Sequence, residues 1–550
     1  MSTRARRRTL QGDSGERPAA LSFEIRPSRR EEAMPAAIAA VALALIALIV
    51  CMGRDYLLLY GDAVAHLGIA RRILDTRNPG LVQLGGVWLP LPHLLMLPFV
   101  QKIAWWQNGV AGAWPSLLCY VLSVAGLYRL ARRVMPSQWA VVATAFYALN
   151  PNLLYLSTTA MTEPLFLAIM IWTTLLAMEC VAAIDAARIP AVNGRMIVLG
   201  LLITAAVLTR YDGWVFGAVV WCVIAWKVSR AQKIRPQLMF CFGFFTLLTV
   251  AGPITWLAYN QHFYHDALDF LRGPYSAAAI EKRTTPPGSH HYPGWHNPFW
   301  AAVLYLRASQ LDASFWETGF LVSAMAIAGL VLAIRRRLEL VSTLLWIPLP
   351  FYIYSIAFGS VPIFIPPLEP HSYYNSRYGM EMLPVFAIFA SITIAWLQER
   401  WSKAQPVLVR LMHPVALLLI AVGAIFMMYR VPLVLKEAMM NSVTRIGFEQ
   451  ALANEIKTFP QGAPILMYNS DHIGALQRAG IPLKQTISET DRDSWNAALA
   501  APAQHAAYVI AIDKDPVEAA VQKHPEDLTE LEVLCTSGQA CARIYKSSRF

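Results

Sequence analysis

Long apolar runs, separated by short polar connections, fill the first 430 residues of the chain. The first run, residues 33–53, carries no charged residue and is long enough for an α-helix to cross a hydrocarbon core. The pattern predicts eleven membrane-spanning helices, the other ten at about residues 113–131, 138–154, 163–183, 196–209, 213–228, 238–258, 315–334, 340–357, 379–397 and 413–430.

The basic residues between these runs predict the orientation of the helices. With the N-terminus in the cytoplasm, the short inner connections hold clusters of Lys and Arg, whereas the short outer turns hold only Arg210 and Arg377. This distribution follows the positive-inside rule. We therefore expect a multi-pass protein of the plasma or inner membrane, with a basic cytoplasmic tail (1–33), a membrane domain (34–430) and, because the number of spans is odd, an outer C-terminal region (431–550).

One further apolar segment, residues 85–104, makes a poor straight helix. It contains three prolines, which lack a backbone donor. If it crossed the membrane, the later helices would invert and the agreement with the positive-inside rule would be lost. We expect it to lie horizontally or re-entrantly at the outer face, within the first of three long outer loops at 54–112, 259–314 and 358–378.

The composition supports a membrane protein. Hydrophobic residues make up 56% of the chain and charged residues 15%, whereas soluble domains average about 25% charged residues. A wholly soluble enzyme and a disordered chain are excluded on this ground. The net charge is +11, and the basic residues responsible for it lie between the apolar runs, where they indicate membrane orientation. We therefore expect no nucleic-acid partner.

Residues 431–550 differ from the rest of the chain. They hold 11 Lys and Arg against 14 Asp and Glu, and short apolar runs alternate with polar helical stretches. This pattern predicts a small α/β domain with a terminal hairpin. Cys535 and Cys541 flank a turn in that hairpin, and outside the cytoplasm they are candidates for a disulfide. The function expected for this domain is acceptor recognition or a lid over the active site.

Two candidate residues lie at the start of the first outer loop. Residues 64–74 present one apolar helical face, and residues 78–80 (Asn-Pro-Gly) end the helix, which we expect on the membrane surface. Asp62 precedes this face, and His66 follows one turn later on the same side. The structural alternative for Asp62 is a helix N-cap.

Two more acids stand at the outer ends of spans. Glu163 precedes Pro164 at the start of one span, and Asp212 lies in a turn between two short spans. Acidic residues also favour helix N-termini for electrostatic reasons alone, so capping is the alternative for both.

Isolated cations accompany these acids. Arg210 and Arg377 are charges at the membrane boundary, where the default interpretation is functional and the alternative is snorkelling. A guanidinium forms bidentate contacts with phosphate, and a carboxylate can accept a proton from an attacking hydroxyl. Tyr378, Lys282 and Arg283 could extend the anion site. The pairs His262/His265 and His290/His291 could bind a metal, but no established metal signature is present and we predict none.

Taken in order, these motifs resemble the GT-C glycosyltransferases, in particular the group of protein O-mannosyltransferases and lipid A aminoarabinose transferases. The resemblance covers roughly residues 34–430, and each motif is short. The motifs are Gly61-Asp62-Ala63 with His66, Trp-Leu-Pro-Leu-Pro-His (88–93), Thr-Glu-Pro (162–164), Leu-Thr-Arg-Tyr-Asp-Gly (208–213) and Ser-Arg-Tyr (376–378).

The resemblance implies a fold and an activity. Such enzymes move a sugar from a polyprenyl-phosphate carrier to an acceptor at the outer membrane face, in glycosylation of the cell envelope. Asp62 matches the catalytic base and Glu163 the second acidic position, while Arg210 and Arg377 suit the carrier phosphate. The protein mannosyltransferases have Asp-Glu where this chain has Asp62-Ala63, which leaves the acceptor open among glycan, lipid and protein. We expect an inverting single displacement, with no firmly predicted cofactor.

Two other functions compete with this one. A lipid-linked sugar flippase or other transporter would also need isolated arginines, but its charges are expected near the bilayer midplane. A non-catalytic membrane scaffold could keep the fold without the chemistry. Release of free prenyl phosphate distinguishes the enzyme from both.

Overall fold

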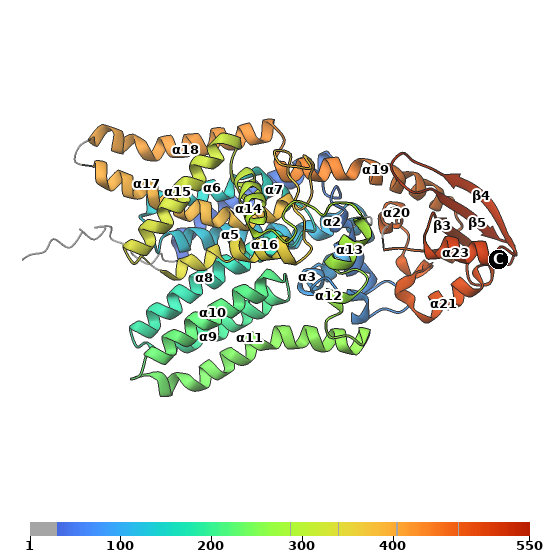
Figure 1. The fold of residues 1–550 in the computed structure, drawn as a ribbon, viewed down its shortest axis with the longest axis horizontal. Coiled ribbons are helices and arrows are strands. Elements are labelled where there is room, and N and C mark those ends of the chain that lie inside the picture. The colour runs from blue at the N-terminus through green and yellow to red at the C-terminus, as the bar shows by residue number, and fades with distance from the viewer. Residues whose placement is uncertain (1–29, 286–287, 339, 403–404, 471) are drawn as a thin grey trace, which may run out of the picture.

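A bundle of long helices and a mixed α/β domain form the two ends of an elongated molecule, with short helices between them (Figure 1). The computed structural model describes residues 30–285, 288–338, 340–402, 405–470 and 472–550. Most of the predicted basic tail, residues 1–29, therefore lies outside the described residues.

The helices of the bundle are apolar and most of them are long, because they form from runs of apolar residues with few charges. Those helices are α1 (Met34–Gly53), α5 (Val110–Ala131), α6 (Ser137–Ala148), α7 (Pro151–Leu156), α8 (Glu163–Asp185), α9 (Ile189–Val207), α10 (Asp212–Arg230), α11 (Arg235–Tyr264), α15 (Trp316–Arg335), α16 (Pro348–Phe358), α17 (Leu383–Trp401) and α18 (Pro406–Tyr429). Two 3₁₀ segments, η3 (Leu340–Trp346) and η4 (Ser376–Met382), precede α16 and α17.

Ten helical segments among the described residues are long and apolar enough to cross a membrane, against the eleven predicted. The difference lies at 138–154, where the structure has the shorter helices α6 and α7. They are separated at Asn150, whose side chain accepts hydrogen bonds from the backbone of Asn152 and Leu153 and so starts a new helix. The protein is a multi-pass membrane protein.

Short helices gather at the end of the bundle that faces the α/β domain (Figure 1). The segment 85–104 forms α3 (Leu91–Val100), whose ten residues span about 15 Å, half the thickness of a hydrocarbon core. The other short helices come from the predicted outer loops: α2 (Gly61–Arg72), α4 (Ile103–Gln107), α12 (Asp269–Arg272), α13 (Ala277–Thr284) and α14 (Pro298–Ala313).

Helix α2 differs from its prediction in two ways. It ends at Arg72, before the expected stop at residues 78–80, and it does not lie free on a membrane surface. The face formed by Val64, Leu67 and Ala70 is buried, and α2 packs between α3 and the C-terminal helix α20 (Ile473–Ala479). A Cβ on Gly68 would approach the Ile473 side chain to 2.5 Å, so a small residue permits this contact.

The C-terminal part has the predicted α/β character. Helix α19 (Leu433–Ile456) leads from the bundle into a five-stranded sheet of order β2-β1-β3-β5-β4. The first three strands are parallel, and β5 and β4 continue the sheet in antiparallel fashion. The elements are β1 (Ile465–Met467), β2 (Thr486–Ile487), β3 (Tyr508–Ile512), β4 (Leu528–Leu534) and β5 (Ala542–Ser547), with α21 (Asp493–Ala500), α22 (Pro502–His505) and α23 (Pro516–Lys523).

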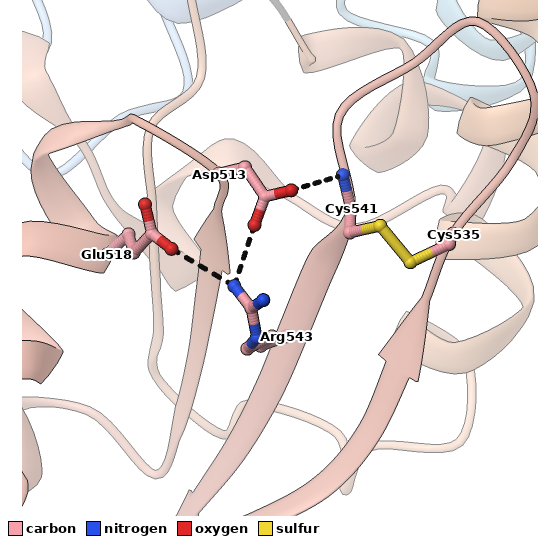
Figure 2. The surroundings of a disulfide bond; sticks show 5 residues. All are labelled: Asp513, Glu518, Cys535, Cys541 and Arg543. Atoms are coloured by element: carbon pink, nitrogen blue, oxygen red, sulfur yellow. Dashed lines mark hydrogen bonds and ion pairs between the residues drawn. A yellow bond between two sulfur atoms is a disulfide. The ribbon is translucent and has the colours of Figure 1, made fainter.

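The hairpin of β4 and β5 carries a disulfide between Cys535 and Cys541 (Figure 2). Next to it, Arg543 bonds both Asp513 and Glu518, and the Asp513 carboxylate accepts a hydrogen bond from the Cys541 backbone (Figure 2). These contacts lower the pKa of the exposed Asp513 carboxyl from its usual value. The edge of the sheet is thus fixed both covalently and by an ion pair with two carboxylates.

Candidate active site

Arg377 connects four segments that are far apart in the sequence. It lies on η4, and its guanidinium contacts Asp62 on α2 at 2.5 Å, Glu163 at the start of α8 at 3.2 Å and Glu437 on α19 at 3.2 Å. Ser376 donates to Glu437 from both its backbone nitrogen and its hydroxyl, which fixes that carboxylate against η4. Asp62 and Arg377, predicted as base and phosphate ligand, are therefore direct partners.

Arg210 forms a second centre beside the first. Its Nη1 lies 3.3 Å from Glu163, and its Nε lies 3.1 Å from both Asp212 and Glu381. Its Nη2 donates to the Tyr352 hydroxyl at 2.6 Å, and that hydroxyl donates in turn to Glu381 at 2.8 Å. Each nitrogen of this guanidinium has an acceptor, so a bound phosphate would have to replace one.

Two side chains join the centres. The carboxylate of Glu163 is shared, since its Oε1 contacts both guanidiniums. The ring of Tyr378 lies 5.0 Å from the Cζ atom of Arg210 and 5.0 Å from that of Arg377, which places both cations within cation–π range. The predicted residues Glu163, Asp212, Arg210, Arg377 and Tyr378 thus form one cluster at the predicted outer ends of the helices.

Charge balance distinguishes this cluster from an ordinary anion site. Five carboxyl groups (Asp62, Glu163, Asp212, Glu381 and Glu437) surround two guanidiniums. A site with more acids than cations repels an added phosphate unless some carboxyls are protonated. The observed contacts therefore support a positioning role for the arginines, and their predicted contact with a carrier phosphate stays a prediction.

Asp62 differs from the other four acids in its accessibility. Its side chain is 42% exposed, whereas those of Glu163, Asp212, Glu381 and Glu437 are at most 2% exposed. It is not the N-cap of α2, a position taken by Tyr60, but lies in the first helical turn. One oxygen is held by Arg377 while the carboxylate stays open to an incoming hydroxyl, which is the geometry that a general base requires.

His66, one turn after this acid, has its recognised contacts with His93 and Trp88. Its Nδ1 lies 2.8 Å from Nε2 of His93, and its ring packs on Trp88 at 4.3 Å between centroids. Burial lowers the pKa of His66 to about 4, an effect that nearby Asp62 opposes. His66 is therefore neutral at pH 7 and supports the packing of α2 on α3 instead of bonding to Asp62.

Lys282 and Arg283 are not brought into the cluster. Both lie on α13, are exposed, and make no ion pair with any described residue. Their neighbour Glu281 is buried and bonds to His291 at 2.7 Å. In the described part of the chain, no group of three or more His, Cys, Asp or Glu residues is placed to hold a metal ion.

Three members of the cluster escaped the sequence analysis. Glu381 lies inside a predicted span, and an acid within an apolar run was a signal that could have identified it. Tyr352 has no such signal, since tyrosine is common in membrane helices. Glu437 was assigned to the soluble domain, and nothing in the local sequence links it to a residue 60 positions earlier.

A further buried acid, Asp312, lies below the cluster near the end of α14. Its side chain is fully buried, and neither carboxyl oxygen accepts a hydrogen bond from the described residues. Burial raises its pKa well above the usual range, and the negative charges of Glu437 and Glu163 add to this effect. Burial and these neighbouring charges therefore favour the protonated form of Asp312.

Comparisons with known proteins agree with this architecture. The family model of dolichyl-phosphate-mannose-protein mannosyltransferases matches residues 90–256, under a third of the chain. The crystal structure of ArnT from Cupriavidus metallidurans bound to undecaprenyl phosphate is similar over 92% of this chain and 97% of that chain, with a TM-score of 0.57 and 14% identity. The chain has a GT-C fold. The predicted resemblance to the GT-C glycosyltransferases is thereby confirmed.

A second GT-C structure has a lower TM-score. The apo oligosaccharyltransferase of Archaeoglobus fulgidus is similar over 86% of this chain and 69% of that chain, with a TM-score of 0.47 and 11% identity. This likeness adds no weight to the fold assignment. No curated protein sequence matches the chain.

Proposed function

We propose that the protein is a glycosyltransferase that moves a hexose or pentose from a polyprenyl-phosphate carrier to a hydroxyl acceptor at the outer membrane face. The observation that carries this proposal is the exposed Asp62 carboxylate, held by Arg377 above four buried acids. The GT-C fold and the matched mannosyltransferase family model support it. The ArnT structure contains undecaprenyl phosphate, which supports a carrier of the same chemical class here.

The proposed reaction is a single displacement. The acceptor hydroxyl transfers its proton to a carboxylate oxygen of Asp62, and its oxygen attacks the anomeric carbon. The bond from that carbon to the carrier oxygen breaks, and prenyl phosphate leaves with the bonding electron pair. Attack opposite the leaving group inverts the anomeric centre. Arg377 orients Asp62 through the ion pair between the two side chains.

The carrier phosphate needs cations whose donors are available. Because both guanidiniums are already paired with acids, we propose that Arg210 and Arg377 contact the phosphate only through rearrangement of these pairs. Lys282 and Arg283 are exposed and have no described ion-pair partner, so α13 is the segment proposed to supply charge to the leaving group.

Transfer by the purified protein in nanodiscs tests the proposal. A panel of polyprenyl-phosphate sugars is offered with glycan, lipid and peptide acceptors, and release of prenyl phosphate is followed for the wild type, Asp62→Asn and Asp55→Asn. Asp55 is exposed and lies in the same loop, so its substitution makes the same change in charge outside the cluster. Release that is lost in Asp62→Asn alone supports the proposal, whereas equal release in all three removes Asp62 from the chemistry.

A further inference from the structure

A cavity of about 200 Å³ lies beside the start of α19. Its walls come from the end of α14, the loop before η4, and the junction between α18 and α19. The lining residues are Leu311, Ser314, Phe315, Pro366, Pro367, Tyr373, Met427, Arg430, Val431, Pro432, Leu433 and Lys436.

The charge in this cavity has a single sign. Arg430 and Lys436 line it, and none of the lining residues is acidic. Neither cation forms an ion pair within the described part of the chain. Both cations instead contact aromatic rings: the Arg430 Cζ lies 5.9 Å from the Phe315 ring centroid, and the Lys436 Nζ lies 5.9 Å from the Tyr373 ring centroid. Such contacts leave the N–H donors free for an anion.

A helix terminus adds to this positive potential. Leu433, the first residue of the 24-residue helix α19, is part of the wall. The N-terminal end of a helix carries a partial positive charge. Here the backbone N–H of Val434 already donates to the Asn152 side chain, so the contribution of the helix end to the cavity is its potential. Two cations and this helix end thus face one cavity that has no carboxylate to neutralise them.

The remaining walls and the surroundings are apolar. Phe315, Met427 and the three prolines line the cavity, and it lies at the end of α18. The outer side of α18 presents Leu418, Leu419, Val422 and Ile425, each more than half exposed, to the surroundings of the bundle. In a membrane helix such a surface contacts lipid chains. The cavity therefore combines a site for an anion with a path for alkyl chains.

We propose that this cavity binds the phosphate group of a membrane lipid, with Arg430 and Lys436 as its ligands and the lipid chains lying along the outer side of α18. The site is separate from the candidate active site. Lys436 lines the cavity, whereas its neighbour Glu437 is bonded to Ser376 and Arg377 in the arginine cluster. The inference does not depend on the proposed transferase activity.

Native mass spectrometry of the delipidated protein in detergent tests this site. Phosphatidic acid, diacylglycerol with the same chains and inorganic phosphate are titrated in turn. Binding of phosphatidic acid is expected to weaken about thirtyfold in Arg430→Gln/Lys436→Gln, since each basic residue near an anionic lipid contributes roughly fivefold. The matched control is Arg54→Gln/Lys102→Gln, which removes two exposed cations from the first predicted outer loop and is expected to change binding less than twofold.

Each outcome decides a part of the proposal. Unchanged phosphatidic acid binding in Arg430→Gln/Lys436→Gln, or equal binding of diacylglycerol, would overturn it. Equal binding of inorganic phosphate would make this a soluble-anion site and overturn the assignment to a lipid. If the double variant does not fold, Ser314→Trp, which fills the cavity and keeps both cations, must abolish binding. Because no sugar transfer is measured, failure here leaves the proposed enzyme untouched.

Discussion

The two ends of the helical bundle place the same types of charged residue in different surroundings. At the predicted cytoplasmic end, Lys227 pairs with Asp185 at 2.9 Å, Arg336 pairs with Glu399 at 3.5 Å, and Glu179 pairs with both Arg129 and Arg195. These side chains are partly exposed to solvent. At the other end, Arg210 and Arg377 together contact five acids, and four of these acids are buried.

This difference shows that burial, more than residue type, decides what an ion pair does. Exposed pairs are screened by water and contribute little to stability, so the inner charges serve mainly to set orientation. Buried charges must be matched closely, because an unpaired one is costly to remove from water. The outer cluster therefore holds its members in fixed positions, as a catalytic site requires.

The largest expected effect concerns the one accessible acid of the cluster. Asp62→Asn is expected to lower the rate of prenyl-phosphate release by about 10²–10⁴-fold, because the amide cannot take up the proton of the acceptor hydroxyl. Steady-state release at saturating donor measures this effect. A rate within threefold of the wild type would contradict the assignment of Asp62 as base.

The comparison between the ends is tested directly by removing one guanidinium from each. Arg377→Gln leaves Asp62, Glu163 and Glu437 without their shared cation and is expected to destabilise the protein by about 3–5 kcal/mol. Arg336→Gln breaks one partly exposed pair and is expected to cost at most about 1 kcal/mol. Thermal unfolding in detergent compares the two variants, and equal losses would remove the distinction.

Acid is expected to destabilise the outer end through His66, whose pKa falls from 6.5 unfolded to about 4 in the folded protein. Between these pH values the unfolded chain binds the proton and the folded chain does not, so stability falls as the pH drops below 6.5. The full loss, below pH 4, is about 3 kcal/mol.

The pH dependence of the unfolding temperature in His66→Gln measures this contribution. That variant should lose less stability than the wild type between pH 7 and pH 4.5, whereas His290→Gln, at an exposed position, should follow the wild type. Parallel curves for all three proteins would show that His66 does not titrate as described.

The smallest expected effect lies in the hairpin and reports which end faces an oxidising compartment. The Cys535–Cys541 bond closes a short loop, so Cys535→Ser/Cys541→Ser is expected to destabilise the α/β domain by about 2 kcal/mol. Alkylation of the denatured protein isolated from cells should label the five free cysteines, and seven after reduction. Seven labels without reduction would contradict an outer location of the domain.

Much of the fold could be predicted from sequence because its signals are local. Apolar runs of sufficient length identified ten spans, and alternating runs identified the C-terminal α/β character and its hairpin. At 138–154 the structure has α6 and α7 in place of one continuous helix, because Asn150-Pro151 interrupts an otherwise apolar run. The surface helix at 61–72 was misplaced because the same apolar face suits a lipid surface and a protein neighbour.

The sequence identified several residues of the cluster but not the contacts between them. Isolated charges in apolar surroundings identified Asp62, Glu163, Arg210 and Arg377, because such residues are costly without a purpose. Their pairing could not be predicted, since Asp62 and Arg377 lie 315 positions apart. For the same reason Lys282 and Arg283 were grouped with the arginines, although the structure leaves them apart on α13.

The sequence by itself determined which segments form long apolar helices, which connections are basic and that the C-terminal part is of α/β type, because hydrophobicity and charge act over one helix length. The tertiary structure alone decided that Glu163 serves two arginines, that Glu381 and Glu437 complete the cluster and that Asp62 stays accessible. Ion pairing and burial depend on how helices from distant parts of the chain pack, and no local sequence pattern predicts that packing.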